Sequence, residues 1–277
     1  QTLSVKSSNS AVIIDTGCDL TLCDCSENQT GKITHAATAT GRGVYMGTST
    51  GTANKYNGSF TMYGGSITGN HFTGGSGAGV YMEGKGTFNM YGGSITDNTT
   101  TVDRTTGGVY VSGGEFNMTG GSITATGGGV KVDGKGTFNM SGDAVISNNN
   151  AYGGGGVTVS NGTFNMSGKA AITGNSVNYG GGVYVYGDRE ATAATFNMSG
   201  NASISGNSAK YGGGVYVSGY GKFTMTGGSI TGNNVSEAGG VYVLDYNATM
   251  IVSGDVQITD NWKNGEKNAD GVYKQGK

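Results

Sequence analysis

The sequence contains no proline, although it is 277 residues long and includes 57 glycines. Every residue after the first therefore keeps a backbone N–H group that can donate a hydrogen bond, as a fold built from continuous strand ladders requires. Only 12% of the residues are charged, and the 16 basic and 18 acidic residues are scattered without runs. This distribution excludes the basic surface of a nucleic-acid-binding protein. No apolar run approaches the length of a membrane span, so we expect no membrane insertion of this segment.

Cysteine and histidine are also scarce. The three cysteines, Cys18, Cys23 and Cys25, fall in one short stretch, and an odd number in so long a chain is no disulfide framework. The two histidines, His35 and His71, have neither the spacing of metal ligands nor that of a catalytic triad. We therefore expect no metal and no cofactor, and we interpret the thiols as covering the first turn of the fold.

What the sequence does contain is one glycine-rich unit repeated eight times, with three short strand-like pieces in each copy. The first piece has the pattern Val-Tyr-Val and begins at Val44, Val80, Val109, Val130, Val157, Val183, Val215 and Val241. The second has the pattern Phe-Asn-Met and begins at Phe60, Phe88, Phe116, Phe138, Phe164, Phe196 and Phe223, with the variant Met250-Ile251-Val252. The third is centred on Ile67, Ile95, Ile123, Ile146, Ile172, Ile204, Ile230 and Ile258.

Alternate side chains of a strand face opposite ways, so each unit turns about five apolar groups to one side. One unit cannot bury them, but stacking it on a copy of itself can. The sequence therefore predicts an all-β fold, a single-stranded right-handed parallel β-helix with three short strands per coil and about nine coils. We expect one domain over residues 1–277, with a degenerate first coil in 1–40 and eight regular coils in 41–261. Residues 262–277 would start a further coil, which we expect to be truncated because no terminal cap is evident.

A column of asparagines supports the coil prediction. An asparagine stands three residues after the inward isoleucine in almost every unit, and only Thr126 interrupts the series. The members are Asn70, Asn98, Asn149, Asn175, Asn207, Asn233 and Asn261. Asparagine tolerates corner conformations, and stacked amides can hydrogen-bond along the axis. We interpret the column as structural.

The stretch SISGNSAKYGGGVYV, residues 203–217, resembles the repeat of polymorphic outer-membrane proteins, which is marked by short GGAI-like and FxxN-like motifs. The resemblance extends from about residue 41 to residue 273, with GGGV in place of GGAI. It implies the pectate-lyase-like right-handed β-helix that adhesin-type bacterial surface proteins share with autotransporter passengers and phage tailspikes. It therefore also implies a surface-exposed adhesin or scaffold segment.

The outward side of the first strand carries a row of tyrosines, which we take as the candidate ligand-binding residues. The candidates are Tyr81, Tyr110, Tyr184, Tyr216 and Tyr242, with Tyr45 and Tyr273 in the same row and Lys131 and Thr158 interrupting it. Exposed aromatic faces on a rigid sheet can stack on sugar rings or on a protein partner. The alternative is mutual stacking, which stabilises the sheet without any ligand. Corner insertions, which often form the binding face of solenoids, fall in 47–59, 71–78, 99–106 and 186–195.

Two further functions stay open as alternatives. A carbohydrate-active enzyme, either a polysaccharide lyase or a glycoside hydrolase, would use carboxylates on one face, and the candidate residues are Asp97, Asp103 and Asp133 near Arg104 and Lys131. An ice-binding solenoid would use the rows of threonine and serine beside the inward isoleucines, although these rows are irregular.

The sequence as a whole favours a non-enzymatic β-helix module of a secreted or surface-attached bacterial protein. We expect it to present its loops and aromatic face to a host or environmental glycan or to a surface protein, outside the cell. End-to-end or side-by-side self-association is a further partner interaction that the repeat allows.

Overall fold

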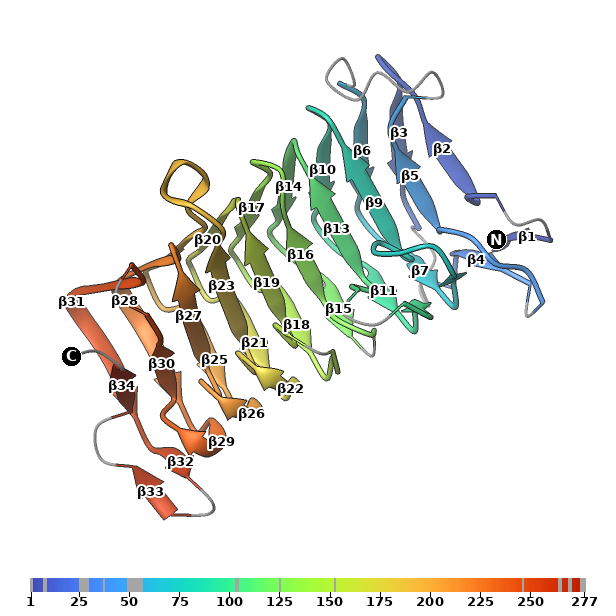
Figure 1. Ribbon diagram of the computed structural model, residues 1–277. Helices are drawn as coiled ribbons and strands as arrows, with labels where there is room; N and C mark the ends of the chain where they lie inside the picture. The colour runs from blue at the N-terminus through green and yellow to red at the C-terminus, as the bar shows by residue number, and fades with distance from the viewer. Residues whose placement is uncertain are drawn as a thin grey trace.

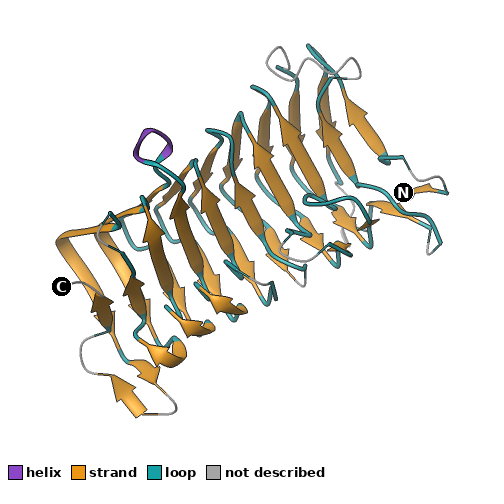
Figure 2. Ribbon diagram, viewed as in Figure 1, coloured by secondary structure: helices purple, strands orange, loops and turns teal. Residues whose placement is uncertain are grey.

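The computed structural model describes residues 2–6, 9–24, 30–36, 38–48, 57–102, 105–124, 126–151, 153–245, 247–263, 266–268 and 271–274. The chain forms one elongated all-β solenoid in which parallel strands stack along a common axis (Figure 1). The one helical segment in the described part is the 3-10 turn η2 (Glu190–Thr192), which projects from the corner between β23 (Val183–Gly187) and β24 (Thr195–Met198) (Figure 2). The predicted all-β parallel solenoid of about nine coils is therefore confirmed.

The Val-Tyr-Val pieces form the first ladder, a 10-stranded parallel sheet in which each strand lies beside its equivalent in the next coil. Its strands are β2 (Val12–Ile14), β5 (Val44–Met46), β9 (Val80–Glu83), β13 (Val109–Ser112), β16 (Val130–Val132), β19 (Val157–Ser160), β23 (Val183–Gly187), β27 (Val215–Gly219), β30 (Val241–Val243) and β34 (Val272–Lys274). The first valine of each piece pairs with the first valine of the next, so the register never slips.

The other two pieces lie in one 17-stranded sheet. Phe-Asn-Met strands are β3 (Asp19–Leu22), β6 (Ser59–Met62), β10 (Thr87–Met90), β14 (Glu115–Met118), β17 (Thr137–Met140), β20 (Thr163–Met166) and β24 (Thr195–Met198). Isoleucine strands are β1 (Thr2–Val5), β4 (Lys32–His35), β7 (Ser66–Thr68), β11 (Ser94–Thr96), β15 (Ser122–Thr124), β18 (Val145–Ser147), β21 (Ala171–Thr173) and β25 (Ser203–Ser205). In the last two coils the pieces merge into the long strands β28 (Lys222–Thr231) and β31 (Thr249–Thr259).

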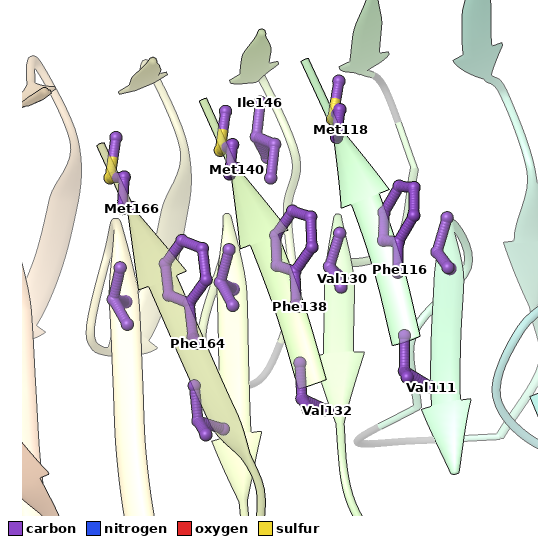
Figure 3. Close-up of a cluster of buried hydrophobic side chains, with 14 of the residues drawn as sticks. Val111, Phe116, Met118, Val130, Val132, Phe138, Met140, Ile146, Phe164 and Met166 are labelled. Carbon is purple, nitrogen blue, oxygen red and sulfur yellow. The ribbon is translucent and has the colours of Figure 1, made fainter. Parts of the chain in front are cut away.

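The inward residues form continuous rows inside the solenoid. The phenylalanine rings of neighbouring coils stack with centroids 4.6–4.9 Å apart, and they are essentially inaccessible to solvent. Figure 3 shows three of these rings, Phe116, Phe138 and Phe164, in line beside the row of methionines. Burying a side chain of this size contributes about 1.5–3 kcal/mol, so the repeated rows supply the main stabilisation of the coils.

The asparagine column lies inside the corner that follows the isoleucine strands. Its asparagines are at most 1% exposed. Each of them donates a hydrogen bond from Nδ2 to the backbone carbonyl of an isoleucine in the preceding coil. Within a run, Nδ2 also donates to the next asparagine Oδ1 at 2.8–3.0 Å. The structural interpretation is confirmed. Histidine extends the column in the first coil, where His35 Nδ1 lies 2.8 Å from Asn70 Oδ1.

Short strands in the same corner form a ladder that the sequence analysis did not predict. Its strands are β22 (Ser176–Tyr179), β26 (Ser208–Tyr211), β29 (Asn234–Ala238), β32 (Asn261–Lys263) and β33 (Glu266–Asn268), and a separate pair is β8 (His71–Phe72) with β12 (Thr99–Thr100). Strand β33 pairs with β32 in the antiparallel sense. This corner ladder widens the solenoid beside the first ladder.

Strands near the beginning of the chain extend both sheets. Strands β2, β3 and β4 pair with β5, β6 and β7 of the next coil, and β1 pairs with β4 from the other side. At the other end, β34 places Val272 beside Val241 and so adds one more strand to the first ladder. No helix in the described part of the chain is long and apolar enough to cross a membrane.

Candidate functional site

The outward face of the first ladder carries the tyrosine row in two runs, which we call the tyrosine column. One run comprises Tyr45, Tyr81 and Tyr110, and the other comprises Tyr184, Tyr216, Tyr242 and Tyr273. Neighbouring rings within each run lie 5.1–5.6 Å apart between centroids. All five candidate ligand residues thus lie on one face, where the rings of neighbouring coils within each run contact one another, some stacked and some tilted.

Three phenol groups of the column form hydrogen bonds with side chains of the next coil along the chain. Tyr45 donates to Glu83 Oε2 at 2.6 Å, Tyr110 donates to Asp133 Oδ2 at 3.3 Å, and Ser218 donates to the Tyr184 oxygen at 3.3 Å. Each partner stands two residues beyond the outward position of its own coil. Burial, together with the neighbouring carboxylates, raises the pKa of Tyr45 and of Tyr110 to about 12. Both phenols therefore stay protonated and donate at any ordinary pH.

Two of the candidate tyrosines are less accessible than the sequence predicts. Tyr216 and Tyr242 are each only 5% exposed, because Tyr179 and Tyr211 of the corner ladder pack over them. The expectation that these two rings present an exposed face is wrong. The cause is the corner ladder, which folds a second aromatic row across the first. Tyr81, Tyr110 and Tyr184 are half-buried.

The column is interrupted where Lys131 and Thr158 take the outward position, and the interruption opens a cavity of about 350 Å³. We call it the Lys131 cavity. Its lining residues are Thr105, Thr106, Lys131, Ala151, Gly153, Thr158, Ser160, Tyr179 and Tyr184. Two of them, Thr105 and Thr106, belong to the corner insertion 99–106, so an insertion and the tyrosine face meet at this place.

The Lys131 cavity combines an ammonium group, hydroxyls and an aromatic wall. Lys131 Nζ lies 5.5 Å from the ring centroid of Tyr110 and 3.9 Å from Asp133 Oδ2, a distance at which the ion pair is weak. The hydroxyl of Thr158 donates a hydrogen bond to the Gly153 carbonyl at 2.8 Å, and this bond joins two of the lining residues. Tyr184 contacts Tyr216 in the next coil, with ring planes tilted by 56°, and it also stacks on Tyr186 of its own strand. In the preceding coil its position pairs with Thr158, which is not aromatic.

The candidate catalytic carboxylates are placed apart or already paired. Asp97 is exposed and has a φ of 54°, at the corner position after β11 where equivalent coils carry Gly69 or Gly174. Asp133 follows β16 at the far end of a first-ladder strand and contacts Tyr110 and Lys131. Asp97 and Asp133 therefore follow strands of different sheets, β11 in the 17-stranded sheet and β16 in the first ladder. Asp103 and Arg104 lie outside the residues that the structure describes.

The structure also places the remaining residues that the sequence singled out. Cys18 and Cys23 are exposed in the first coil, and Cys25 lies outside the described residues. Among the described residues there is no group of three His, Cys, Asp or Glu side chains that could hold a metal ion. On the outward side of the Phe-Asn-Met strands, a second amide ladder links Asn89, Asn117, Asn139, Asn165 and Asn197 at 2.8–3.1 Å. This ladder was not predicted from the sequence, although the repeated central asparagine was its signal.

The Lys131 cavity was also missed as a site, and its signal was the replacement of two tyrosines in a row that otherwise repeats. The cavity became recognisable only when the insertion and the corner ladder were placed around the replacements. Comparison with known proteins found no matching family, no matching curated protein and no matching solved structure.

Proposed function

We propose that this β-solenoid is a non-enzymatic binding module of a secreted or surface-attached bacterial protein, and that it binds a glycan in the Lys131 cavity. The observation that carries the proposal is the cavity at the one interruption of the tyrosine column. In the later coils of the column, Tyr216 and Tyr242 are almost fully buried and leave little aromatic surface for a ligand.

The chemistry of the cavity suits a sugar. The part of the Tyr184 ring that lines the cavity offers an apolar surface for the C–H face of a pyranose. The hydroxyl of Ser160 and the ammonium of Lys131 line the cavity and offer hydrogen bonds to the sugar hydroxyls, whereas the Thr105 hydroxyl already donates to the Val102 carbonyl. A cavity of about 350 Å³ accommodates one or two sugar rings, so we expect a short segment of a longer chain to be recognised.

The rest of the molecule suits a rigid carrier for such a site. Rows of fully buried side chains and two amide ladders run along the axis, and the loops are confined to corners. A stiff solenoid of this kind holds a binding face at a distance from its point of attachment. The resemblance of the repeat to adhesin-type surface proteins supports the same role.

The test is a glycan array probed with the wild-type protein and with Thr158→Tyr. This substitution extends the tyrosine column into the interruption and fills the cavity, so binding to the wild-type ligand should fall at least tenfold, which is about 1.4 kcal/mol. Thr163→Tyr is the matched control, because Thr163 is half-buried on the Phe-Asn-Met face of the same coil. It should bind like the wild type.

Retained binding by Thr158→Tyr, with an unchanged melting temperature, would refute the assignment of the site. The bound glycan should also be recovered intact. Release of new reducing ends or unsaturated uronates would instead favour the alternative of a carbohydrate-active enzyme.

A further inference from the structure

A second hollow lies on the same face near the beginning of the chain, around Arg42. The guanidinium carbon is 3.8 Å from the ring centroid of Phe72, 4.4 Å from that of Tyr81 and 5.9 Å from that of Tyr45. Phe72 comes from the corner strand β8, and Tyr81 comes from β9 in the next coil. Rings from two elements thus hold the guanidinium plane, an arrangement that arginine tolerates because its charge is delocalised and weakly hydrated.

The charge of Arg42 is not matched by an ion pair with any described residue. Its Nε is buried and has no hydrogen-bond partner, and no described carboxylate lies within 4.0 Å of the guanidinium. Glu83, the acidic side chain of this cluster, accepts the hydrogen bond from Tyr45 instead. Burial lowers the pKa of Arg42, and the nearby phenols and Glu83 only partly oppose that effect. A partly buried cation without a close counter-ion is costly, so an incoming anion would offset a desolvation penalty already present.

Space for an anion lies directly beside this cation. A hollow of about 350 Å³ is lined by Asn9, Ser10, Ile13, Gly41, Arg42, Tyr45 and Phe72. Asn9 and Ser10 contribute polar groups at one side, and Ile13, which is 57% exposed, contributes an apolar wall. We call this space the Arg42 hollow.

We propose that the Arg42 hollow binds a carboxylate group of a ligand. The rings of Phe72 and Tyr81 lie over the guanidinium, and a planar guanidinium can present two parallel N–H groups that match the two oxygens of a carboxylate. The carboxylate can come from an acidic peptide or from an acidic sugar, because both present the same group. The proposal does not depend on glycan binding in the Lys131 cavity, which uses different residues in later coils.

The test is a titration of the ¹⁵N-labelled protein, followed through the Nε–Hε signal of Arg42. The probes are a blocked glutamate peptide and glucuronate, and their uncharged counterparts are the blocked glutamine peptide and glucose. We expect both carboxylates to shift the Arg42 signal in a saturable way and the uncharged probes to leave it in place. The tighter of the two acids then identifies the ligand source, and equal affinities indicate recognition of the carboxylate alone.

Variants provide an independent check. Arg42→Lys keeps the charge but loses the planar fork, so carboxylate affinity should fall about tenfold. Arg189→Lys is the matched control, because Arg189 is exposed in the loop before η2. An Arg42 signal that none of the carboxylates moves would overturn the proposal, as would equal losses in the two variants. Thr158→Tyr should leave this titration unchanged, which separates failure here from failure of the proposed glycan site.

Discussion

At the scale of single residues, the two asparagine ladders show how burial decides what a hydrogen bond contributes. Asn207 is fully buried, donates to the Ile172 carbonyl at 3.0 Å and to Asn233 Oδ1 at 2.9 Å, and accepts from the side chain of Asn175 at 2.9 Å. Asn197 belongs to the outer ladder and donates to Asn165 Oδ1 at 2.9 Å, but it is half-buried. If Asn197 is removed, water can hydrogen-bond to Asn165 in its place. Water cannot reach the groups that Asn207 contacts, because they are buried.

Replacement of Asn207 by alanine should therefore destabilise the protein far more than the same change at Asn197. In Asn207→Ala, the buried backbone N–H of Asn175 loses its acceptor and the Ile172 carbonyl loses the Asn207 donor, which costs about 3 kcal/mol. For Asn197→Ala the loss should stay below about 1 kcal/mol. Denaturant unfolding followed by circular dichroism measures both values. Equal losses would mean that the inner ladder is not the stabilising element that its burial indicates.

The residue scale also explains which parts of the sites were predictable. Inward positions follow from alternation along three-residue strands, so Val, Phe, Met and Ile could be assigned without coordinates. The covering of Tyr216 could not be assigned, because it depends on Tyr179 crossing from a corner whose path the local sequence does not determine. Arg42 was missed for the same reason, since its contact with Phe72 joins segments 30 residues apart through a corner strand.

At the scale of elements, the first ladder couples its strands through side chains as well as through the backbone. Tyr45 of β5 reaches Glu83 of β9, and Tyr110 of β13 reaches Asp133 after β16. These contacts bury neutral phenols and favour the protonated form. The stability of the ladder is therefore linked to the ionisation of its tyrosines.

This linkage predicts a loss of stability at high pH. The pKa of Tyr45 and of Tyr110 is raised from 10.0 to about 12 in the folded state, so the folded protein holds protons that the unfolded chain releases. Their contribution is complete below pH 10 and declines as the pH rises towards 12. Urea unfolding at a series of alkaline pH values measures the slope. In Tyr45→Phe part of this dependence should disappear, whereas a slope identical to that of the wild type would contradict the coupling.

The repeated sequence does not by itself determine where every strand begins and ends. The Phe-Asn-Met and isoleucine pieces were expected as separate strands, and they are separate in the regular coils. In β28 and β31 they run together, where Thr226 and Ser253 follow the methionine position and the strand continues through the corner. The corner ladder was equally unpredicted, because pieces such as Ser208–Tyr211 carry no inward apolar alternation of their own. Their strand structure comes from pairing with the neighbouring coil.

At the scale of the whole molecule, the solenoid is a stack whose units contact only their neighbours along the axis. The coil of residues 215–240 pairs Val215 with Val183 below and with Val241 above. The Phe-Asn-Met and isoleucine positions keep the same correspondence, since Phe223 lies between Phe196 and Met250 and Ile230 lies between Ile204 and Ile258. Each coil thus pairs equivalent residues with the coil before it and with the coil after it.

Deletion of residues 215–240 should therefore leave a folded, shorter solenoid. Gly214 would then be followed by Val241, with Met250 over Phe196 and Asn261 over Asn207, so every internal row is continuous. We expect a cooperative transition with a melting temperature only ~5 °C below that of the wild type, because stability in such stacks is close to a sum over units and interfaces. The molecule should also shorten by about 4.8 Å, the spacing of one strand. Small-angle scattering and thermal denaturation measure the two effects.

Deletion of residues 215–226 is the contrasting variant. It removes fewer residues but leaves the isoleucine strand directly after Gly214, where a Val-Tyr-Val strand belongs. Gly227 would then take the position beside Val183, and Ile230 would take the position beside Tyr186. The amide of Asn233 would leave its column, and the internal rows would be broken at one coil. This shorter deletion should abolish the cooperative transition, although it removes less buried surface than the full coil. If both deletions behaved alike, the stability of the molecule would not depend on the register of whole coils.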